Sequence, residues 1–187
     1  KNTQKLSAVV KNIILILITI GIVSSCPFTE IPDPTYTGLE HTTGAMIVQQ
    51  GSHLYAIGGT DNEGNILSAI HQAEITLVNG KPELSPWKLS DLPLPEGRAS
   101  AAAMAIGDYL FVIGGMGSGG PTDTIFITKI NSTDGADDGS LGFGTVSKYW
   151  ITNTIPLPEP RAEMAWAYHD GRIFLIGGKG TEGNFST

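Results

Sequence analysis

The chain has 187 residues, of which 24 are glycine and 11 are proline, and 41% of the residues are apolar. This apolar content excludes a disordered chain, while the glycine and proline content indicates short strands joined by many turns. Residues 27–187 carry 18 acidic and 8 basic side chains, a net charge of −10, so we expect no nucleic-acid partner. No stretch after residue 40 has a sustained 3.6-residue apolar period, so little helix is expected.

The first 25 residues have the layout of a secretory signal. Lys1, Lys5 and Lys11 come first, the apolar stretch 13–23 follows, and small residues come last. A helix of this apolar stretch would rise only about 16 Å, which is too short to cross a hydrocarbon core of about 30 Å. Residues 1–25 are therefore predicted to be a signal peptide.

The stretch VSSC at 23–26 resembles the lipobox of bacterial lipoproteins. The resemblance implies cleavage before Cys26 and a lipid on its thiol and new amine, with 26–40 as a lipidated, proline-rich tether. The implied location is the cell envelope, on the outer face of a bacterial membrane. Pro27, in place of Asp, favours the outer membrane or cell surface over the inner membrane. A plain signal peptide or an uncleaved anchor, with an incidental cysteine, is the alternative.

Residues 93–115 and 156–178 align without a gap. Four landmark pairs each lie 63 positions apart: Trp87 and Trp150, Pro93 and Pro156, Arg98 and Arg161, Gly114 and Gly177. A looser copy covers 42–59, and its Gly58 lies 56 positions before Gly114. Landmarks that stay in register over this length indicate a repeated structural unit.

Each unit is predicted to form four short strands. In the better-defined unit they cover 99–106, 109–115, 124–130 and 148–152, with a turn at Gly107 and Asp108 between the first two. In the preceding unit, residues 73–78 and 86–90 take the third and fourth places. Short antiparallel strands that repeat at this period are typical of β-propeller blades.

An apolar strand that ends in Gly-Gly, followed by a Trp and then by an Arg eleven residues later, resembles the kelch repeat. The likeness is to the bacterial group that shares the fold of the galactose oxidase central domain, and it covers 41–187. It implies an all-β, kelch-type propeller of four-stranded antiparallel blades. About 2.5 blades are present, so we expect the front of a longer protein or, alternatively, assembly from several chains. The structural landmarks of the repeat are Gly58, Gly59, Trp87, Gly114, Gly115, Trp150, Gly177 and Gly178.

Arg98 and Arg161 are the candidate ligand-binding residues, because each is a fixed charge at the mouth of the innermost strand. In the alternative interpretation, each arginine bonds carbonyls and a carboxylate between blades. Glu163 could act as a general base if burial raised its pKa, or it pairs with a neighbouring arginine. Kelch families often carry a His three residues after the Arg, but this chain has Ala101 and Met164 there.

No catalytic residue, metal site or cofactor is predicted. The histidines at 41, 53, 71 and 169 have no ligand spacing with one another, and His53 and His169 are expected to be solvated. A copper centre of the galactose oxidase kind needs a cysteine cross-linked to tyrosine, whereas the only cysteine is Cys26. Trp87 and Trp150 are predicted to pack outer strands.

The resemblance implies a binding module that takes a glycan or a protein partner through the loops at one propeller face. A carbohydrate-active enzyme such as a sialic-acid mutarotase or epimerase is the first alternative, and a structural envelope protein is another. Converging Arg and Glu side chains would favour the enzyme. Apolar patches on the loops would favour a protein partner.

Overall fold

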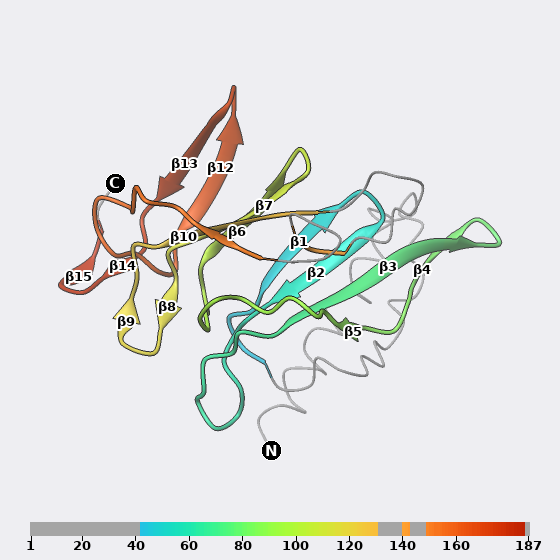
Figure 1. Ribbon diagram of the computed structural model, residues 1–187, viewed down its shortest axis with the longest axis horizontal. Helices are drawn as coiled ribbons and strands as arrows, with labels where there is room; N and C mark the ends of the chain where they lie inside the picture. The colour runs from blue at the N-terminus through green and yellow to red at the C-terminus, as the bar shows by residue number, and fades with distance from the viewer. Residues whose placement is uncertain (1–41, 131–139, 143–148, 186–187) are drawn as a thin grey trace, which may run out of the picture. The chain divides into compact units, whose positions relative to one another are not determined.

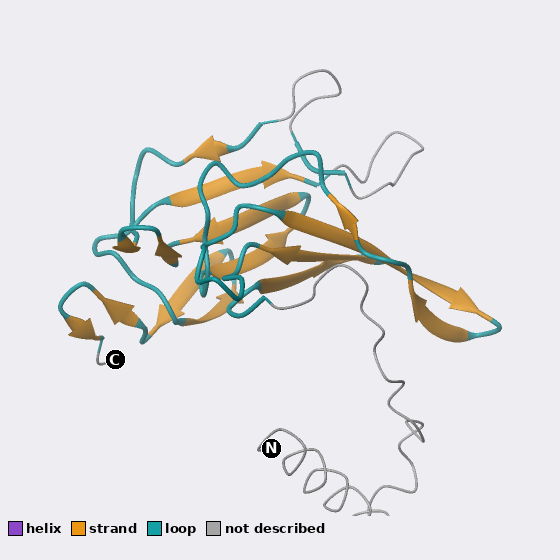
Figure 2. Ribbon diagram, turned by 90° about the horizontal axis from the view of Figure 1, so that it is seen from below, coloured by secondary structure: helices purple, strands orange, loops and turns teal. Residues whose placement is uncertain are grey.

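The computed structural model describes residues 42–130, 140–142 and 149–185 (Figure 1). Over these ranges it contains strands, turns and loops only, as the colouring of Figure 2 shows, so the all-β prediction is confirmed. Within the same ranges there is no helix long and apolar enough to cross a membrane. The predicted signal peptide, Cys26 and the tether lie outside the described residues.

The first unit is an antiparallel sheet in the order β1-β2-β3, and both β4 and β5 pair with β3. The strands are β1 (Met46–Gln50), β2 (His53–Ile57), β3 (Ile70–Val78), β4 (Lys81–Leu84) and β5 (Lys88–Leu89). β5 pairs with the beginning of β3, at His71 and Gln72, and so takes the fourth place of a blade. β4 pairs with the far half of β3 and extends it into a hairpin that leaves the rest of the sheet (Figure 1).

This hairpin is absent from the sequence-based prediction, although the chain carries a signal for it. Asn79 and Gly80 form the turn, with φ of 52° and 77°. Positive φ at both central residues is the requirement of a type I′ turn, which suits an Asn-Gly pair. The strand that was predicted over 73–78 begins earlier, at Ile70, because it also pairs with β2.

The second unit is a four-stranded antiparallel sheet in the order β11-β10-β7-β6. Its strands are β6 (Ala102–Ile106), β7 (Tyr109–Ile113), β10 (Ile125–Lys129) and β11 (Ile151–Thr152). All four predicted strands are present and the turn at Gly107 and Asp108 joins β6 to β7, but the strands are shorter than predicted. β6 does not reach back to Ala99, because Ser100 has a φ of 52° and breaks the strand.

The third unit is described as the antiparallel pair β12 (Ala165–His169) and β13 (Arg172–Ile176). A two-stranded hairpin follows the second strand in each of the two later units. These hairpins are β8 (Met116–Gly117) with β9 (Gly120–Pro121), and β14 (Lys179–Gly180) with β15 (Gly183–Asn184). We call the segment after the second strand of a unit its 2–3 loop; in the first unit it covers 58–69.

The core lies between successive sheets. The first and second units meet through residues such as Tyr55, Ile57, Ile70, Leu110 and Val112, none of which is exposed. A second cluster joins the second and third units around Ala102, Met104, Ile113 and Met164. The first strands of the two sheets, β1 and β6, are neighbours, so the sheets follow one another along the chain and meet through their first strands.

Candidate functional site

The backbone of each repeat arginine joins its unit to the one before it. The Arg98 N–H donates to the Leu67 carbonyl at 3.1 Å, and its carbonyl accepts from the Gly59 N–H at 2.8 Å. Arg161 repeats both bonds, to the Thr122 carbonyl at 2.9 Å and from the Gly115 N–H at 2.8 Å. The glycine pair of one unit and the arginine of the next are therefore linked by backbone hydrogen bonds, and we call this contact the joint between units.

The joint explains why glycine stands in this position. Gly114 has a φ of 59°, and a Cβ added to it would overlap the Arg161 carbonyl oxygen. Gly58 has the same relation to the Arg98 carbonyl, with a φ of 58°. The backbone must come this close for the bonds between units to form, so a side chain has no room there.

The Arg98 side chain lies inside the protein, with 1% of its surface exposed, and its Nε is buried without a hydrogen-bond acceptor. Its Nη2 donates to the Glu96 carboxylate at 2.9 Å and to the Thr124 hydroxyl at 2.6 Å, and its Nη1 donates to the Gly97 carbonyl at 2.8 Å. The guanidinium carbon also lies 4.8 Å from the centre of the Phe126 ring. The carbonyl and the carboxylate belong to the two residues before Arg98, so these bonds are local, whereas the structural interpretation placed them between blades.

Arg161 occupies the matching place but has different partners. Its guanidinium carbon lies 3.9 Å from the centre of the Phe185 ring, and its Nη1 donates to the Gly177 carbonyl at 3.3 Å. It is half-buried, and none of the ion pairs between described residues includes it. The two repeat arginines therefore share a backbone role and differ in how their charge is compensated.

Glu163 lies next to the beginning of β12, two residues after Arg161, and is exposed. Its φ is 56°, and its N–H donates to the Ser100 carbonyl at 2.9 Å. Ser100 in turn donates its N–H to the Gly44 carbonyl at 2.8 Å, and Gly44 has a φ of 66°. Gly44, Ser100 and Glu163 stand at equivalent places in the three units, and their backbone hydrogen bonds link one unit to the next. No contact between described residues joins the Glu163 carboxylate to an arginine.

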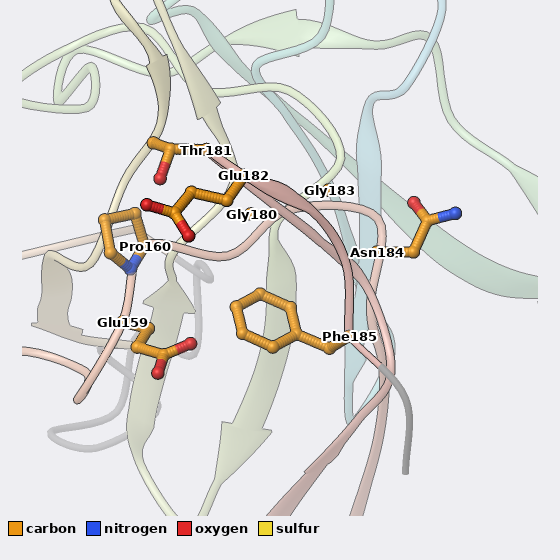
Figure 3. Close-up of a pocket in the computed structure, with 8 residues that line it drawn as sticks. All are labelled: Glu159, Pro160, Gly180, Thr181, Glu182, Gly183, Asn184 and Phe185. Atoms are coloured by element: carbon orange, nitrogen blue, oxygen red, sulfur yellow. The ribbon is translucent and has the colours of Figure 1, made fainter.

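A polar cleft lies between the segment that leads into Arg161 and the 2–3 loop of the third unit. We call it the Phe185 cleft; its lining is Glu159, Pro160, Gly180, Thr181, Glu182, Gly183, Asn184 and Phe185. Its volume is about 460 Å³. In the view of Figure 3, the carboxylates of Glu159 and Glu182 lie on the same side of the Phe185 ring. Carboxylates, an amide, a hydroxyl and an aromatic ring thus meet in one hollow.

A second cleft, of about 580 Å³, lies between the segment that leads into Arg98 and the 2–3 loop of the first unit, with Ser118 of the second unit at its edge. We call it the Arg98 cleft; it is lined by Gly64, Asn65, Ile66, Glu96, Gly97, Arg98 and Ser118. Its Asn65 side chain is held by the Asp61 carboxylate at 3.0 Å, and the Asn65 N–H bonds the same carboxylate at 2.9 Å. These bonds from Asn65, with backbone bonds from Glu63 and Gly64, lower the pKa of Asp61 and outweigh its desolvation.

The 2–3 loops of the first and third units share a motif that the sequence analysis missed. Residues 63–66 read EGNI and residues 182–185 read EGNF. In both, the glycine has a positive φ, of 86° at Gly64 and 135° at Gly183. The signal was present in the sequence, but it lies after the glycine pairs on which the repeat was aligned.

The histidine prediction is wrong in one case. His53 is buried, with 5% of its surface exposed, because it begins β2 opposite Glu74 and the outer strands of its sheet cover it. His169 is exposed. Among the described residues, no group of His, Cys, Asp and Glu side chains has the arrangement of a metal site.

The three tryptophans differ in burial and in packing. Trp150 packs against the first core cluster, with its ring edge towards Phe126 at a centroid distance of 6.4 Å. Trp87 is half-buried, and the indole N–H groups of both Trp87 and Trp150 lie buried without a hydrogen-bond acceptor. Trp166 is 44% exposed on the inner strand β12.

Comparison with known proteins bears on the fold. No family model matches the sequence. Beta-scruin of Limulus polyphemus is 28% identical over 161 residues, which cover 83% of this chain and 15% of that protein. Alpha-scruin of the same organism is 29% identical over 125 residues, covering 67% of this chain and 12% of that protein. The solved structure of YjhT has a TM-score of 0.55 at 20% identity, over 79% of this chain and 41% of the other.

These likenesses support a kelch-type β-propeller fold for this chain. The first two units are then two blades of this fold, and β12 with β13 forms the inner half of a third. Both clefts lie beside a segment that leads into a repeat arginine. The Phe185 cleft uses the 2–3 loop of the same unit, whereas the Arg98 cleft uses mainly that of the preceding unit. The chain spans less than half the length of the two scruins and of YjhT.

Proposed function

We propose that this protein is a binding module of the bacterial cell envelope that takes a glycan through the 2–3 loops of its kelch blades. The observation that carries the proposal is the Phe185 cleft, whose lining includes Glu159, Glu182, Asn184 and Thr181 together with one aromatic ring. Sugars offer hydroxyl groups that donate and accept hydrogen bonds, and apolar ring faces that pack on aromatic side chains. The lining of this cleft matches both features.

A glycan fits the clefts better than a protein partner does. The large exposed apolar residues of the first blade lie outside the cleft linings: Leu77, Val78 and Leu84 belong to the β3–β4 hairpin, Leu89 belongs to β5, and Ile47 belongs to β1. Around both clefts the exposed side chains are carboxylates, amides and hydroxyls. Polar groups that converge in a hollow favour a small, hydroxyl-rich ligand over a flat apolar interface.

The proposed location follows from the amino-terminal sequence. A lipid on Cys26 would hold the blades at the outer face of a membrane, with residues 27–40 as the tether. The predicted preference for the outer membrane or cell surface belongs to the same proposal. The excess of acidic residues in the rest of the chain supports a partner other than nucleic acid.

The proposal is tested by binding to a panel of neutral, acidic and amino oligosaccharides, measured by calorimetry. Binding to at least one class is expected, with a loss of about tenfold in Asn184→Ala because a hydrogen bond to the ligand is removed. Thr76→Ala, an exposed change on the β3–β4 hairpin, is the control and should bind as the unmodified protein does. A folded protein that binds no class of glycan would contradict the proposal.

A carbohydrate-active enzyme, such as a sialic-acid mutarotase or epimerase, is the second candidate. The observation in its favour is that Glu163 leaves its carboxylate exposed two residues from the half-buried Arg161. In that function Arg161 would bind the sugar carboxylate and Glu163 would transfer a proton. Interconversion of sialic-acid anomers, followed by NMR, should then be faster with the protein than with Glu163→Gln. A purely structural envelope role predicts neither binding nor turnover.

A further inference from the structure

The same short motif, Pro-Glu-x-Arg, has two different charge arrangements in this protein. In the second blade the carboxylate of Glu96 accepts a hydrogen bond from Arg98 at 2.9 Å. In the third blade Arg161 instead stacks on Phe185 and donates to a carbonyl, and no cation among the described residues pairs with Glu159. The third blade thus has a carboxylate, Glu159, that lines a cleft and lacks the arginine partner that its equivalent, Glu96, has in the second blade.

The Phe185 cleft holds a second carboxylate and no basic side chain. Glu159 and Glu182 are the charged residues of its lining, and both are exposed to solvent. The volume of about 460 Å³ lies within the range of small-molecule sites, which is about 300–1,000 Å³. The cleft therefore combines space for a small ligand with an uncompensated negative charge.

The Arg161 guanidinium pairs with neither carboxylate among the described contacts: its carbon lies 3.9 Å from the centre of the Phe185 ring and its Nη1 donates to the Gly177 carbonyl. The contact with the ring covers one of its faces and leaves Phe185 to meet a ligand through the surface that lines the cleft. An acidic sugar would meet two carboxylates without a free cation, which is unfavourable. A cationic sugar would meet complementary charge.

We propose that the ligand of the Phe185 cleft is a glycan with free, protonated amino groups, such as an oligomer of glucosamine. This inference rests on the glycan-binding function proposed above and names its substrate class. The ammonium group pairs with Glu159 and Glu182, the ring hydroxyls bond Asn184 and Thr181, and an apolar ring face packs on Phe185. The net charge of −10 over residues 27–187 attracts such a cation at long range.

The test compares two oligomers that differ only at the nitrogen: the tetramer of glucosamine and the tetramer of N-acetylglucosamine. Calorimetry with the full chain at about pH 6 keeps the amine protonated and the carboxylates ionised. Each solvent-exposed ion pair changes affinity by about threefold, so two pairs predict a preference of about tenfold for the amine. Added salt should reduce this preference, because it screens exposed charges.

The variants Glu159→Gln and Glu182→Gln should each lower the amine preference about threefold and leave the acetylated oligomer unaffected. Glu83→Gln on β4 removes an equal charge away from the cleft and is the matched control. Equal binding of both tetramers, or tighter binding of acidic sugars, would overturn this inference and leave glycan binding intact. Absence of binding to every glycan class would overturn the proposed function itself.

Discussion

Gly114 gives the sharpest test of how the blades are joined. It follows β7 with a φ of 59°, and a Cβ there would overlap the Arg161 carbonyl oxygen and lie 2.9 Å from the Met164 Cε. Gly107, in the turn between β6 and β7, has nearly the same φ, 58°, but a Cβ there has no neighbour within 4 Å. Alanine at the two positions therefore has the same backbone cost and differs only in contacts.

The magnitudes follow from these environments. Holding alanine in the left-handed region costs about 1 kcal/mol, so Gly107→Ala should lower the free energy of unfolding by about that amount. In Gly114→Ala the two blades must also separate. This weakens the bonds from the Gly115 N–H to the Arg161 carbonyl at 2.8 Å and from the Arg161 N–H to the Thr122 carbonyl at 2.9 Å, each worth about 1 kcal/mol. With the disturbed packing at Met164, the expected total is about 4 kcal/mol.

The assay is thermal or urea unfolding followed by tryptophan fluorescence. Trp150 packs against the first core cluster and should report the unfolding of the second blade. A difference of about 3 kcal/mol between the variants corresponds to a melting temperature about 6–12 °C lower for Gly114→Ala than for Gly107→Ala. If both variants melted together, the contact between glycine and the next blade would not be the reason for the glycine pair.

Further tests concern the arginines, a histidine and the anchor. Arg98→Ala should lower the free energy of unfolding by about 3 kcal/mol and Arg161→Ala by about 1 kcal/mol, because several hydrogen bonds are lost only with the Arg98 side chain. Urea unfolding that ranked the two variants in the opposite order would refute this. Burial lowers the pKa of His71, so the folded protein binds that proton less tightly than the unfolded chain, and stability should fall as the pH drops below about 6.5. His71→Gln should flatten that part of the pH profile in unfolding curves at about pH 7 and about pH 5, and an unchanged slope would assign it to other groups. Cys26→Ala should release the protein from the membrane fraction, and unchanged fractionation would contradict the lipid anchor.

The architecture was within reach of the sequence because it depends on repetition. The spacing of Arg98 and Arg161, and of the glycine pairs, predicted successive all-β units with strands at the observed places. The β3–β4 hairpin was not predicted, although Asn79 and Gly80 are a strong turn signal. Repetition predicts only the features that the units share, and this hairpin belongs to the first unit. The location of the chain and its lipid anchor remain predictions.

The sequence did not predict which groups pair with each charged side chain. Arg98 and Arg161 stand at equivalent places, yet only the folded chain shows that Glu96 pairs with one while Phe185 stacks on the other. The reason is that Glu96 and Glu159 stand at equivalent places, whereas the aromatic partners Phe126 and Phe185 come from a third strand and a 2–3 loop whose sequences differ between blades. The sequence by itself determined the repeated landmarks, and at Gly58 and Gly114 the contact with the next unit leaves no room for a Cβ. The tertiary structure decided which carboxylates are left to face a cleft.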